Sequence, residues 1–204
     1  MVFTKLDELY SARDILRTFF QNIGILTDAE ISVLLELTTL SYLKKGAYFI
    51  REEEVCEELV FTVSGMLRSY FTKDDGEEIT YCFTLPHHLM TAYSSFITGN
   101  PTVESIQALT DTELLVIKKS DFVRLTQSSS NWIVLQKFFA EQQYMALEQR
   151  IFSYQKEKAK QRYTDLVGQE PVLLQQVSLQ HLASFLNITP RHLGRIRKEV
   201  LKGE

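Results

Sequence analysis

Residues 177–200 constrain the fold more than any other stretch, because they read as two short helices joined by a tight turn. Ser178 suits the N-cap of the first helix, and Thr189 followed by Pro190 suits the start of the second. Asn187 lies where the first helix must stop, and Asn tolerates the left-handed conformation found there. Apolar residues at helical spacing predict the buried faces of both helices: Leu179, Leu182, Ala183, Leu186, Leu193, Ile196 and Val200.

The outward face of the second predicted helix is polar and basic. A helix with such a face can enter the major groove of DNA, where the fork of an Arg side chain grips guanine or phosphate. The pattern therefore predicts a helix-turn-helix that reads double-stranded DNA, and a solvated helical hairpin in an all-α cap is the alternative. The predicted DNA-binding residues are Ser178, Thr189, Arg191, His192, Arg195, Arg197 and Lys198.

Charge is distributed unevenly along the chain. Residues 1–141 contain 12 Lys and Arg against 20 Asp and Glu, a net charge of −8, whereas residues 142–204 contain 10 against 6, a net charge of +4. A basic C-terminal part on an acidic body is typical of a chain that binds a polyanion at one end. The net charge of −4 for the whole chain therefore does not argue against DNA as the partner.

Hydropathy argues against a membrane partner. No apolar run approaches the length of a membrane span, and residues 1–7 lack the layout of a signal peptide. A hydrophobic content of 45% with 24% charged residues is ordinary for a soluble globular protein. We therefore expect a cytoplasmic protein.

Between residues 42 and 118 the apolar residues change from helical to alternating spacing, which predicts β-strands. The clearest alternation runs from Ile79 to Leu85, directly after a hairpin turn at residues 73–76. Short strands separated by Gly and Asp turns are typical of a small antiparallel β-barrel or jelly roll, which can enclose a ligand. Further strands are expected over residues 48–50, 59–63, 66–71, 105–109 and 113–117.

Helices are predicted on both sides of the strands. Residues 10–43 read as two helical pieces, the second opened by a capping box from Thr27 to Glu30, and Ser120 suits the cap of a short helix. Residues 132–167 read as one long helix or two in series, which the Gly and Pro of residues 168–171 end. Side chains near heptad spacing predict a homodimer seam, with packing against the barrel alone as the alternative. They are Leu135, Phe138, Gln142, Met145, Gln149 and Phe152.

The predicted fold class is therefore α+β, with an N-terminal antiparallel β-barrel or jelly roll, a long connecting helix and a C-terminal helical domain. We expect a sensor barrel with N-terminal helices over residues 1–130. A connecting and dimerisation helix is expected over residues 131–167, and the helix-turn-helix domain over residues 168–204.

Metal sites and catalytic sites find little support in the sequence. Cys56 and Cys82 are far apart and lack a CxxC partner, and His87 and His88 follow a Pro in an expected surface turn of the strand region. No nucleophile with a base, no P-loop and no GxGxxG is present. We expect no metal, no cofactor and no enzymatic activity. A ligand- or partner-binding regulatory module whose helix-turn-helix does not bind DNA is the alternative function.

The order of barrel, long helix and terminal helix-turn-helix resembles that of the Crp/Fnr family of bacterial transcription regulators, over essentially the whole chain. The resemblance implies a cytoplasmic homodimer that binds a two-fold operator, with RNA polymerase as a further partner and a signal sensed in the barrel. Its local matches are residues 44–46, 63–68, 74–78, 108–114, 182–183 and 194–196.

Departures from the family pattern concern the effector, the operator and the iron–sulfur branch. Cyclic-nucleotide-binding members carry an Arg-Ser/Thr-Ala step that neutralises the cyclic phosphate, and here that slot holds Thr102-Val103-Glu104. We therefore expect a small-molecule effector other than cyclic AMP, and the aromatic residues near this slot suit a neutral ligand. The residues proposed to line the effector pocket are Tyr81, Tyr93, Phe96 and Thr102.

Three further departures concern DNA reading, iron and the C-terminal wing. The Arg-Glu pair that precedes the Gly-Arg-Ile step in the family is replaced by Pro190 and Arg191, so we expect a different operator sequence. The N-terminal cysteine cluster of the iron–sulfur branch is absent from the sequence. Family members with a β-hairpin wing need residues beyond the position of Glu204, which follows soon after the predicted recognition helix.

Overall fold

The structure is a computed structural model that describes residues 5–202. Residues 1–4, part of the stretch that lacks a signal-peptide layout, and residues 203–204 lie outside the described residues. The described chain divides into two units. Unit 1 runs up to Ser69 and continues with Phe83–Phe139, and unit 2 comprises Tyr70–Cys82 and the chain from Ala140 onward.

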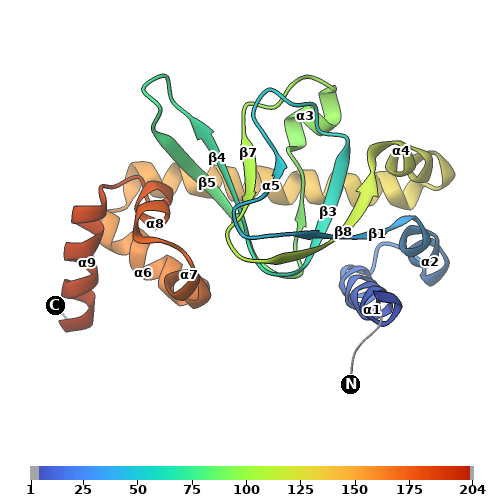
Figure 1. Ribbon diagram of the computed structural model, residues 1–204, viewed down its shortest axis with the longest axis horizontal. Helices are drawn as coiled ribbons and strands as arrows, with labels where there is room; N and C mark the ends of the chain where they lie inside the picture. The colour runs from blue at the N-terminus through green and yellow to red at the C-terminus, as the bar shows by residue number, and fades with distance from the viewer. Residues whose placement is uncertain (1–4, 203–204) are drawn as a thin grey trace. The chain divides into compact units, whose positions relative to one another are not determined.

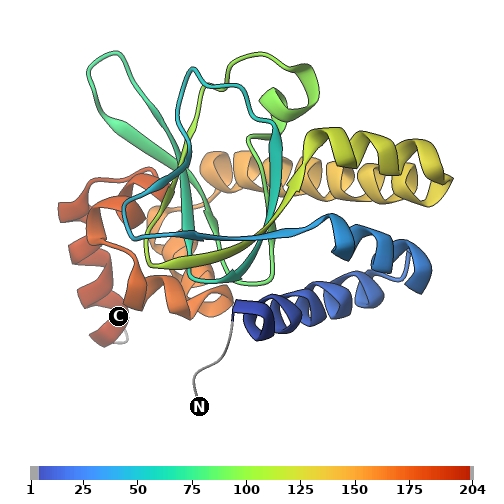
Figure 2. The same ribbon diagram turned by 45° about the vertical axis from the view of Figure 1, so that its right-hand side comes forward.

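Two helices open unit 1, α1 (Lys5–Ile23) and α2 (Asp28–Leu37) (Figure 2). The predicted capping box is confirmed, because Thr27 Oγ1 accepts from the Glu30 N–H at 3.2 Å and the Glu30 carboxylate accepts from the Thr27 N–H at 2.8 Å. The second helical piece is shorter than predicted. It ends at Leu37, and Thr39–Leu43 form strand β1 instead, since β8 lies beside this segment and pairs with it.

The strands form two four-stranded sheets, which confirms the antiparallel jelly-roll core. The first sheet has the order β1-β8-β3-β6 and the second has the order β2-β7-β4-β5. In the first sheet β8 is central, and Leu59 of β3 pairs with Ile117. The remaining strands are β2 (Tyr48–Ile50), β3 (Glu58–Ser64), β4 (Leu67–Thr72), β5 (Glu78–Thr84), β6 (Leu89–Met90), β7 (Ser105–Ala108) and β8 (Thr112–Lys118).

Alternation along β8 divides unit 1 into two apolar cores, because successive side chains of a strand point to opposite faces. Leu114 and Val116 belong to a core that also contains residues of both sheets, such as Val60 and Ile106. The other core contains Leu115 and Ile117 with residues of the helices: Ala12, Leu16, Ile31, Leu34, Leu125, Trp132 and Leu135. The continuous apolar run at residues 114–117 of β8 is thus explained, because both faces of this strand are buried.

Two short helices complete unit 1, α3 (Tyr93–Thr98) and α4 (Lys119–Ser128). Helix α3 was not predicted, since six residues are too few for a helical period to be recognised. The cap predicted for the second is wrong: Lys118 is the N-cap of α4 without a side-chain hydrogen bond, and Ser120 lies within the first turn. This start is fixed by tertiary context, since the Lys119 N–H donates to the Glu57 carbonyl at 2.8 Å.

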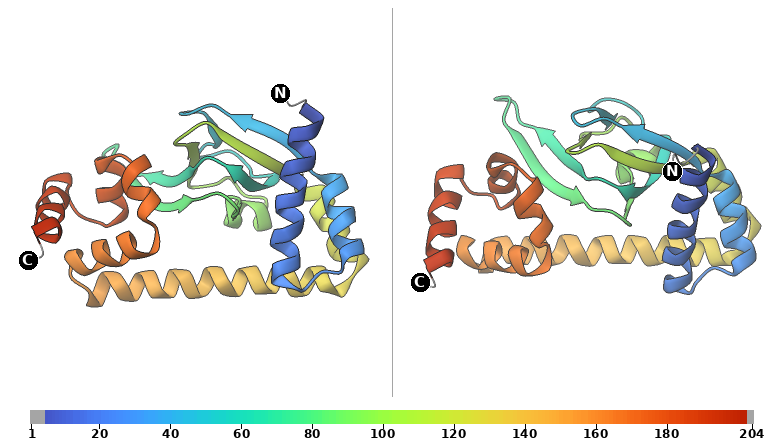
Figure 3. Two further views of the ribbon diagram at one scale, coloured as in Figure 1. Left: turned by 90° about the horizontal axis from the view of Figure 1, so that it is seen from below. Right: turned by 60° about the horizontal axis from the view of Figure 1, so that its bottom comes forward.

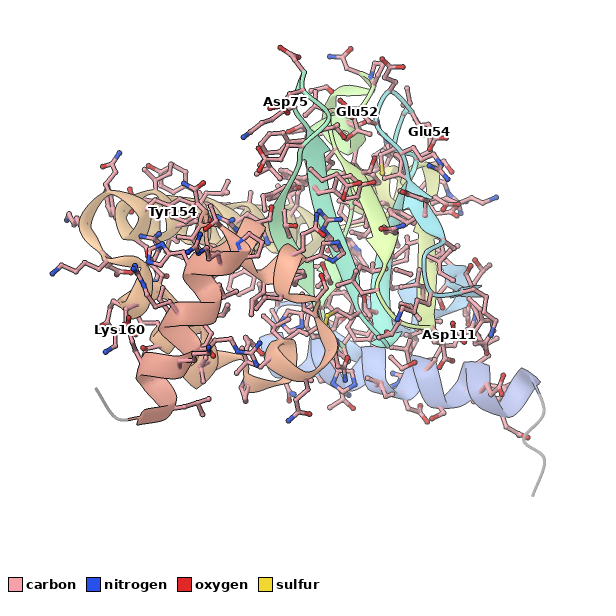
Figure 4. All side chains as sticks on the ribbon, turned by 60° about the vertical axis from the view of Figure 1, so that its left-hand side comes forward. Glu52, Glu54, Asp75, Asp111, Tyr154 and Lys160 are labelled. Carbon is pink, nitrogen blue, oxygen red and sulfur yellow. The ribbon has the colours of Figure 1, made fainter. Side chains whose placement is uncertain are left out.

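Three turns that carry the family resemblance meet in unit 1. The Gly46 N–H donates to the Ala108 carbonyl at 2.8 Å, and the Leu109 N–H donates to the Met66 carbonyl at 2.8 Å. Asp111, labelled in Figure 4, accepts from the Lys44 ammonium at 2.8 Å, and this hydrogen bond lowers the pKa of the Asp111 carboxyl. Residues 44–46, 63–68 and 108–114 therefore form one connected set of turns.

The predicted long helical segment is a series of helices, α5 (Ser130–Lys156), α6 (Ala159–Gln169) and α7 (Pro171–Gln176) (Figure 3). Gly168 does not break the chain but lies inside α6. Pro171 starts a helix that the sequence did not predict, because Pro tolerates the first helical position. Along residues 5–202, no helix combines the length and the apolar character that a membrane span requires.

Helix α5 exposes apolar side chains in this single chain. Residues 141–149 are all exposed. The seam predicted from heptad spacing needs correction, because Leu135 is only 3% exposed and belongs to a core of unit 1, so it is not available to a second copy. The exposed apolar side chains of the helix are Ile133, Val134, Tyr144, Met145, Leu147, Ile151 and Phe152.

Candidate nucleic-acid interface

Two helices near the C-terminus of unit 2 form the predicted helix-turn-helix, α8 (Leu179–Phe185) and α9 (Pro190–Lys202) (Figure 1). Both predicted caps are present. Ser178 Oγ accepts from the His181 N–H at 3.1 Å, and Thr189 Oγ1 accepts from the His192 N–H at 3.2 Å. Each hydroxyl satisfies one of the backbone donors that a helix start leaves without an intrahelical partner.

The turn between α8 and α9 is closed by backbone hydrogen bonds. Asn187 has a φ of 55°, which is the left-handed conformation expected for it from the sequence. The Ile188 N–H donates to the Ala183 carbonyl and the Asn187 N–H donates to the Ser184 carbonyl, both at 3.0 Å. This pair of bonds is the Schellman arrangement of a helix C-terminus, so the turn is fixed by local interactions.

The inner faces of the two helices are largely as predicted. Leu182, Ala183, Leu186, Leu193 and Ile196 are each at most 3% exposed. Two assignments need correction, because Leu179 is 39% exposed and Val200 is only half-buried. Three residues that the sequence did not assign to a core are also buried in unit 2, namely Tyr163 of α6, Leu173 of α7 and Val177.

The basic side chains of α9 differ in exposure. Arg191, Arg195 and Lys198 are exposed and share one face, since they follow the i, i+4, i+7 spacing of a helix. His192 and Arg197 are half-buried at the flanks of this face. The Arg195 side chain is 70% exposed, and its Nε lies 3.7 Å from Glu199 Oε1, one turn further on. A pair at this distance and exposure constrains Arg195 only weakly.

Side chains of α5 and α6 hold the end of α8, a contact that the sequence did not predict. Tyr154, labelled in Figure 4, donates its hydroxyl hydrogen to the Phe185 carbonyl at 2.6 Å. The Arg150 guanidinium donates to the same carbonyl at 3.3 Å, and Arg162 donates to the Leu186 carbonyl at 3.1 Å. These carbonyls lie at the C-terminus of the helix, where partial negative charge favours cations. No local signal reveals such bonds, because they join residues 24 to 35 positions apart.

Comparisons with known proteins agree with this architecture. Residues 40–129 match the sequence model of the family described as "Cyclic nucleotide-binding domain". FixK2 from Bradyrhizobium japonicum is similar with a TM-score of 0.73 and 18% identity, covering 81% of this chain and 85% of that chain. A transcriptional regulator of the Crp/Fnr family from Eubacterium rectale is similar with a TM-score of 0.71 and 18% identity, covering 91% and 89%.

The chain has the Crp/Fnr fold. A third similar structure, the c-di-GMP-responsive regulator CLP from Xanthomonas campestris, has a TM-score of 0.67 and 16% identity, covering 87% of this chain and 93% of that chain. A comparison with curated proteins finds no match. The predicted resemblance to Crp/Fnr regulators is confirmed for the fold, and at these identities the solved structures show the fold alone.

Within the Crp/Fnr fold, the proposed effector residues lie in different settings. Phe96 is 5% exposed and packs in the core against Phe122, with ring centroids 6.0 Å apart, whereas Tyr93 is 38% exposed at the start of α3. Thr102 is buried and its Oγ1 accepts from the Glu104 N–H at 3.1 Å. Tyr81 is half-buried in unit 2.

Charged groups of the roll also have defined places. Glu104, in the slot where family members have the Arg-Ser/Thr-Ala step, is 9% exposed. Arg68 of β4 is 1% exposed, and this buried cation was not among the predicted site residues. Leu67 packs between the sheets, so alternation directs the neighbouring Arg68 to the opposite face of β4.

Figure 4 shows Glu52 and Glu54 at the end of unit 1 opposite Asp111. His87 and His88 are exposed, and His87 lies in the predicted turn with a φ of 66°.

Proposed function

We propose that this protein is a sequence-specific DNA-binding regulator of transcription, controlled by a signal received in the jelly roll. The observation that carries the proposal is the basic face of α9. Arg191, Arg195 and Lys198 are exposed on one face of a helix whose start is capped and whose inner face is packed on α8. A rigid helix with such a face is what a major groove admits.

Within the groove, we assign Arg195 to a base edge and Arg191 to a second one. An Arg fork reads guanine by two parallel hydrogen bonds to O6 and N7, so a base contact carries sequence information. Lys198 is assigned to phosphate, which adds affinity without sequence information. Glu199 lies 3.7 Å from Arg195 and competes with DNA for it, so binding requires Arg195 to leave a weak, exposed pair.

The same proposal includes a homodimer formed along α5. Exposed apolar side chains on that helix, among them Met145 and Phe152 of the predicted seam, need a covering surface of the same chemistry. A second copy provides it, and two helix-turn-helix motifs double the contacts to an operator with two-fold symmetry. RNA polymerase, implied by the family resemblance, is the partner that would convert operator binding into regulation.

For the signal, we propose a small molecule other than cyclic AMP, or another event in the roll. CLP is named as responsive to c-di-GMP, so a protein of this fold can respond to a ligand other than cyclic AMP. In this chain Thr102, Val103 and Glu104 occupy the phosphate-recognising slot and bring no cation to it. A cyclic phosphate placed there without a compensating charge would lose its hydration without recovering that free energy.

Binding to DNA fragments tests the proposal. The purified protein is mixed with fragmented genomic DNA, bound fragments are recovered and sequenced, and the enriched fragments are examined by gel shift at two salt concentrations. We expect a shared sequence and a shift that survives competition by unrelated DNA. Binding that is weak, uniform across fragments and abolished by moderate salt would favour the regulatory module that does not read DNA.

A further inference from the structure

We propose that strand β5 is the positioning support of the helix-turn-helix, with Ser184 and Arg150 as the positioning residues that fix α8 on the strand. The strand thereby sets where α9 is presented to DNA. This inference rests on the proposed function, because a positioned helix matters only if it reads DNA.

Ser184 connects α8 directly to the backbone of β5. Its Oγ accepts from the Thr80 N–H at 2.9 Å, and its hydroxyl donates to the Glu78 carbonyl at 3.0 Å. The two residues belong to one edge of one strand, and β5 is the terminal strand of its sheet. A terminal strand directs backbone donors and acceptors outward, where another element can bind them. Here that element is the first helix of the DNA-reading motif.

Arg150 of α5 reinforces the same contact from a third element. Its guanidinium donates to the carbonyl of Tyr81 on β5 and, at 3.3 Å, to the carbonyl of Phe185 on α8. It also lies over the Phe185 ring, 4.3 Å from the centroid, and donates to the Tyr154 hydroxyl at 2.7 Å. One cation therefore joins α5, α8 and β5, with the geometry of charge-assisted hydrogen bonds.

The contact leaves the DNA-reading face of α9 uncovered. It uses the last residues of α8, whereas Arg191, Arg195 and Lys198 are exposed while the contact is formed. A contact that covered these side chains would inhibit DNA binding. This one fixes the orientation of the motif and lowers the conformational entropy that DNA binding must otherwise remove.

Strand β5 also passes from one unit to the other without a break. Residues up to Cys82 belong to unit 2, and Phe83 and Thr84, the last residues of the strand, belong to unit 1. A change in the jelly roll that shifts this strand acts on Ser184 and Arg150 along a single segment of backbone. Strand β5 therefore connects the jelly roll, where the signal is received, directly to the helix-turn-helix.

The test compares a full two-fold operator with a single half-site. Orientation matters when two motifs must reach two half-sites together, and it matters little for one half-site. Replacing Ser184 by Ala removes both bonds without weakening the helix, since Ala has the highest helix propensity. We expect Ser184→Ala to bind the full operator about tenfold more weakly, by loss of hydrogen bonds in each subunit, and to bind the half-site like wild type. Hydrogen exchange at the Thr80 amide should become faster.

Three variants separate positioning from folding. Ser178→Ala removes the N-cap of α8 and should weaken full operator and half-site alike. Ser184→Thr keeps a hydroxyl and should restore the full operator, and Arg150→Gln should reproduce the pattern of Ser184→Ala. Equal affinity of Ser184→Ala and wild type for the full operator, or tighter binding by the variant, would overturn the inference. A wild-type protein that selects no half-site would instead refute the proposed function.

Discussion

Among single residues, Arg195 is one that we propose to read a base edge of the operator. We expect Arg195→Ala to cost about 1–3 kcal/mol at one base pair and to relax selection there. Lys198→Ala should weaken binding to all sequences alike and reduce the dependence on salt. Both effects are measured by titrating labelled operators with single base changes at several salt concentrations. An Arg195→Ala protein with unchanged base preference would show that another residue reads that position.

Gly65 gives a prediction about the stability of the fold. It has a φ of 86°, and a Cβ there would lie 2.5 Å from the Asp111 carbonyl oxygen. Gly65→Ala therefore combines backbone strain with a clash and should lower the free energy of unfolding by about 3 kcal/mol or more. Gly46 is the matched control, because its φ is 85° but a Cβ added there would meet nothing within 4 Å. Gly46→Ala should cost only about 1 kcal/mol in the same urea titration.

At the scale of elements, the cap of α2 gives a pH dependence. Partial burial would raise the pKa of Glu30, but hydrogen bonds from Ser129, Thr27 and Asn131 outweigh it and lower the pKa to about 2 from 4.5. A depressed carboxyl pKa stabilises the fold fully above pH 4.5 and loses this contribution as the pH falls toward 2.

The Glu30→Gln variant isolates this contribution. It should be less stable than wild type by about 1 kcal/mol near neutral pH, as for other lost helix caps. Since wild type loses the advantage of the carboxylate in acid, the difference between the two proteins should shrink between pH 4.5 and pH 2. Urea unfolding of both proteins across this range measures it. A difference that is constant with pH would contradict the role given to Glu30.

Elements with local signals were predicted well, and elements made by distant contacts were not. Thr27, Ser178 and Thr189 cap their helices as the sequence indicates, because a cap depends on residues two or three positions away. Strand β1 was read as helix, since only its pairing with β8 makes it a strand. The bonds from Ser184 to β5 span more than 100 residues, so no periodicity could reveal them.

The residues of the candidate site also divide into those predictable from local sequence and those that depend on distant contacts. The basic face of α9 was predictable because helical spacing places Arg191, Arg195 and Lys198 together. The half-burial of His192 and Arg197 was not, since it depends on neighbouring elements. Pro171 was read as a break because a Pro that ends one helix and a Pro that begins another look alike in sequence.

For the molecule as a whole, binding to a two-fold operator requires a dimer, which we propose to form along α5. Met145→Glu or Phe152→Glu would place a charge in the apolar contact of the predicted seam, and we expect dimer affinity to fall at least about 100-fold. Gln143 is exposed and lies on the opposite side of the helix by its spacing from these residues, so Gln143→Glu is the control and should dimerise normally. Light scattering over a range of concentrations measures both. A wild-type protein that is monomeric at micromolar concentration would contradict the proposed dimer.

The jelly roll itself gives a prediction about which nucleotides the protein does not bind. With Thr102, Val103 and Glu104 in place of a cation, neither cyclic AMP nor cyclic GMP should bind with a dissociation constant below about 100 μM, or roughly −5.5 kcal/mol. Glu104, which is 9% exposed, would repel a cyclic phosphate brought against it. Calorimetry with each nucleotide at millimolar concentration checks this. Saturable heat at lower concentration would mean that another cation serves the phosphate.

Selection of operator DNA measures whether the exposed basic face of α9 reads sequence as part of a two-fold assembly. Fragments enriched by wild-type protein should share an inverted repeat whose half-sites are about one helical turn, roughly 10 base pairs, or a multiple of it apart. The Arg195→Ala protein, selected in parallel, should lose preference at one symmetric pair of positions. Fragments that share no sequence, or a wild-type pattern that Arg195→Ala reproduces unchanged, would contradict the account.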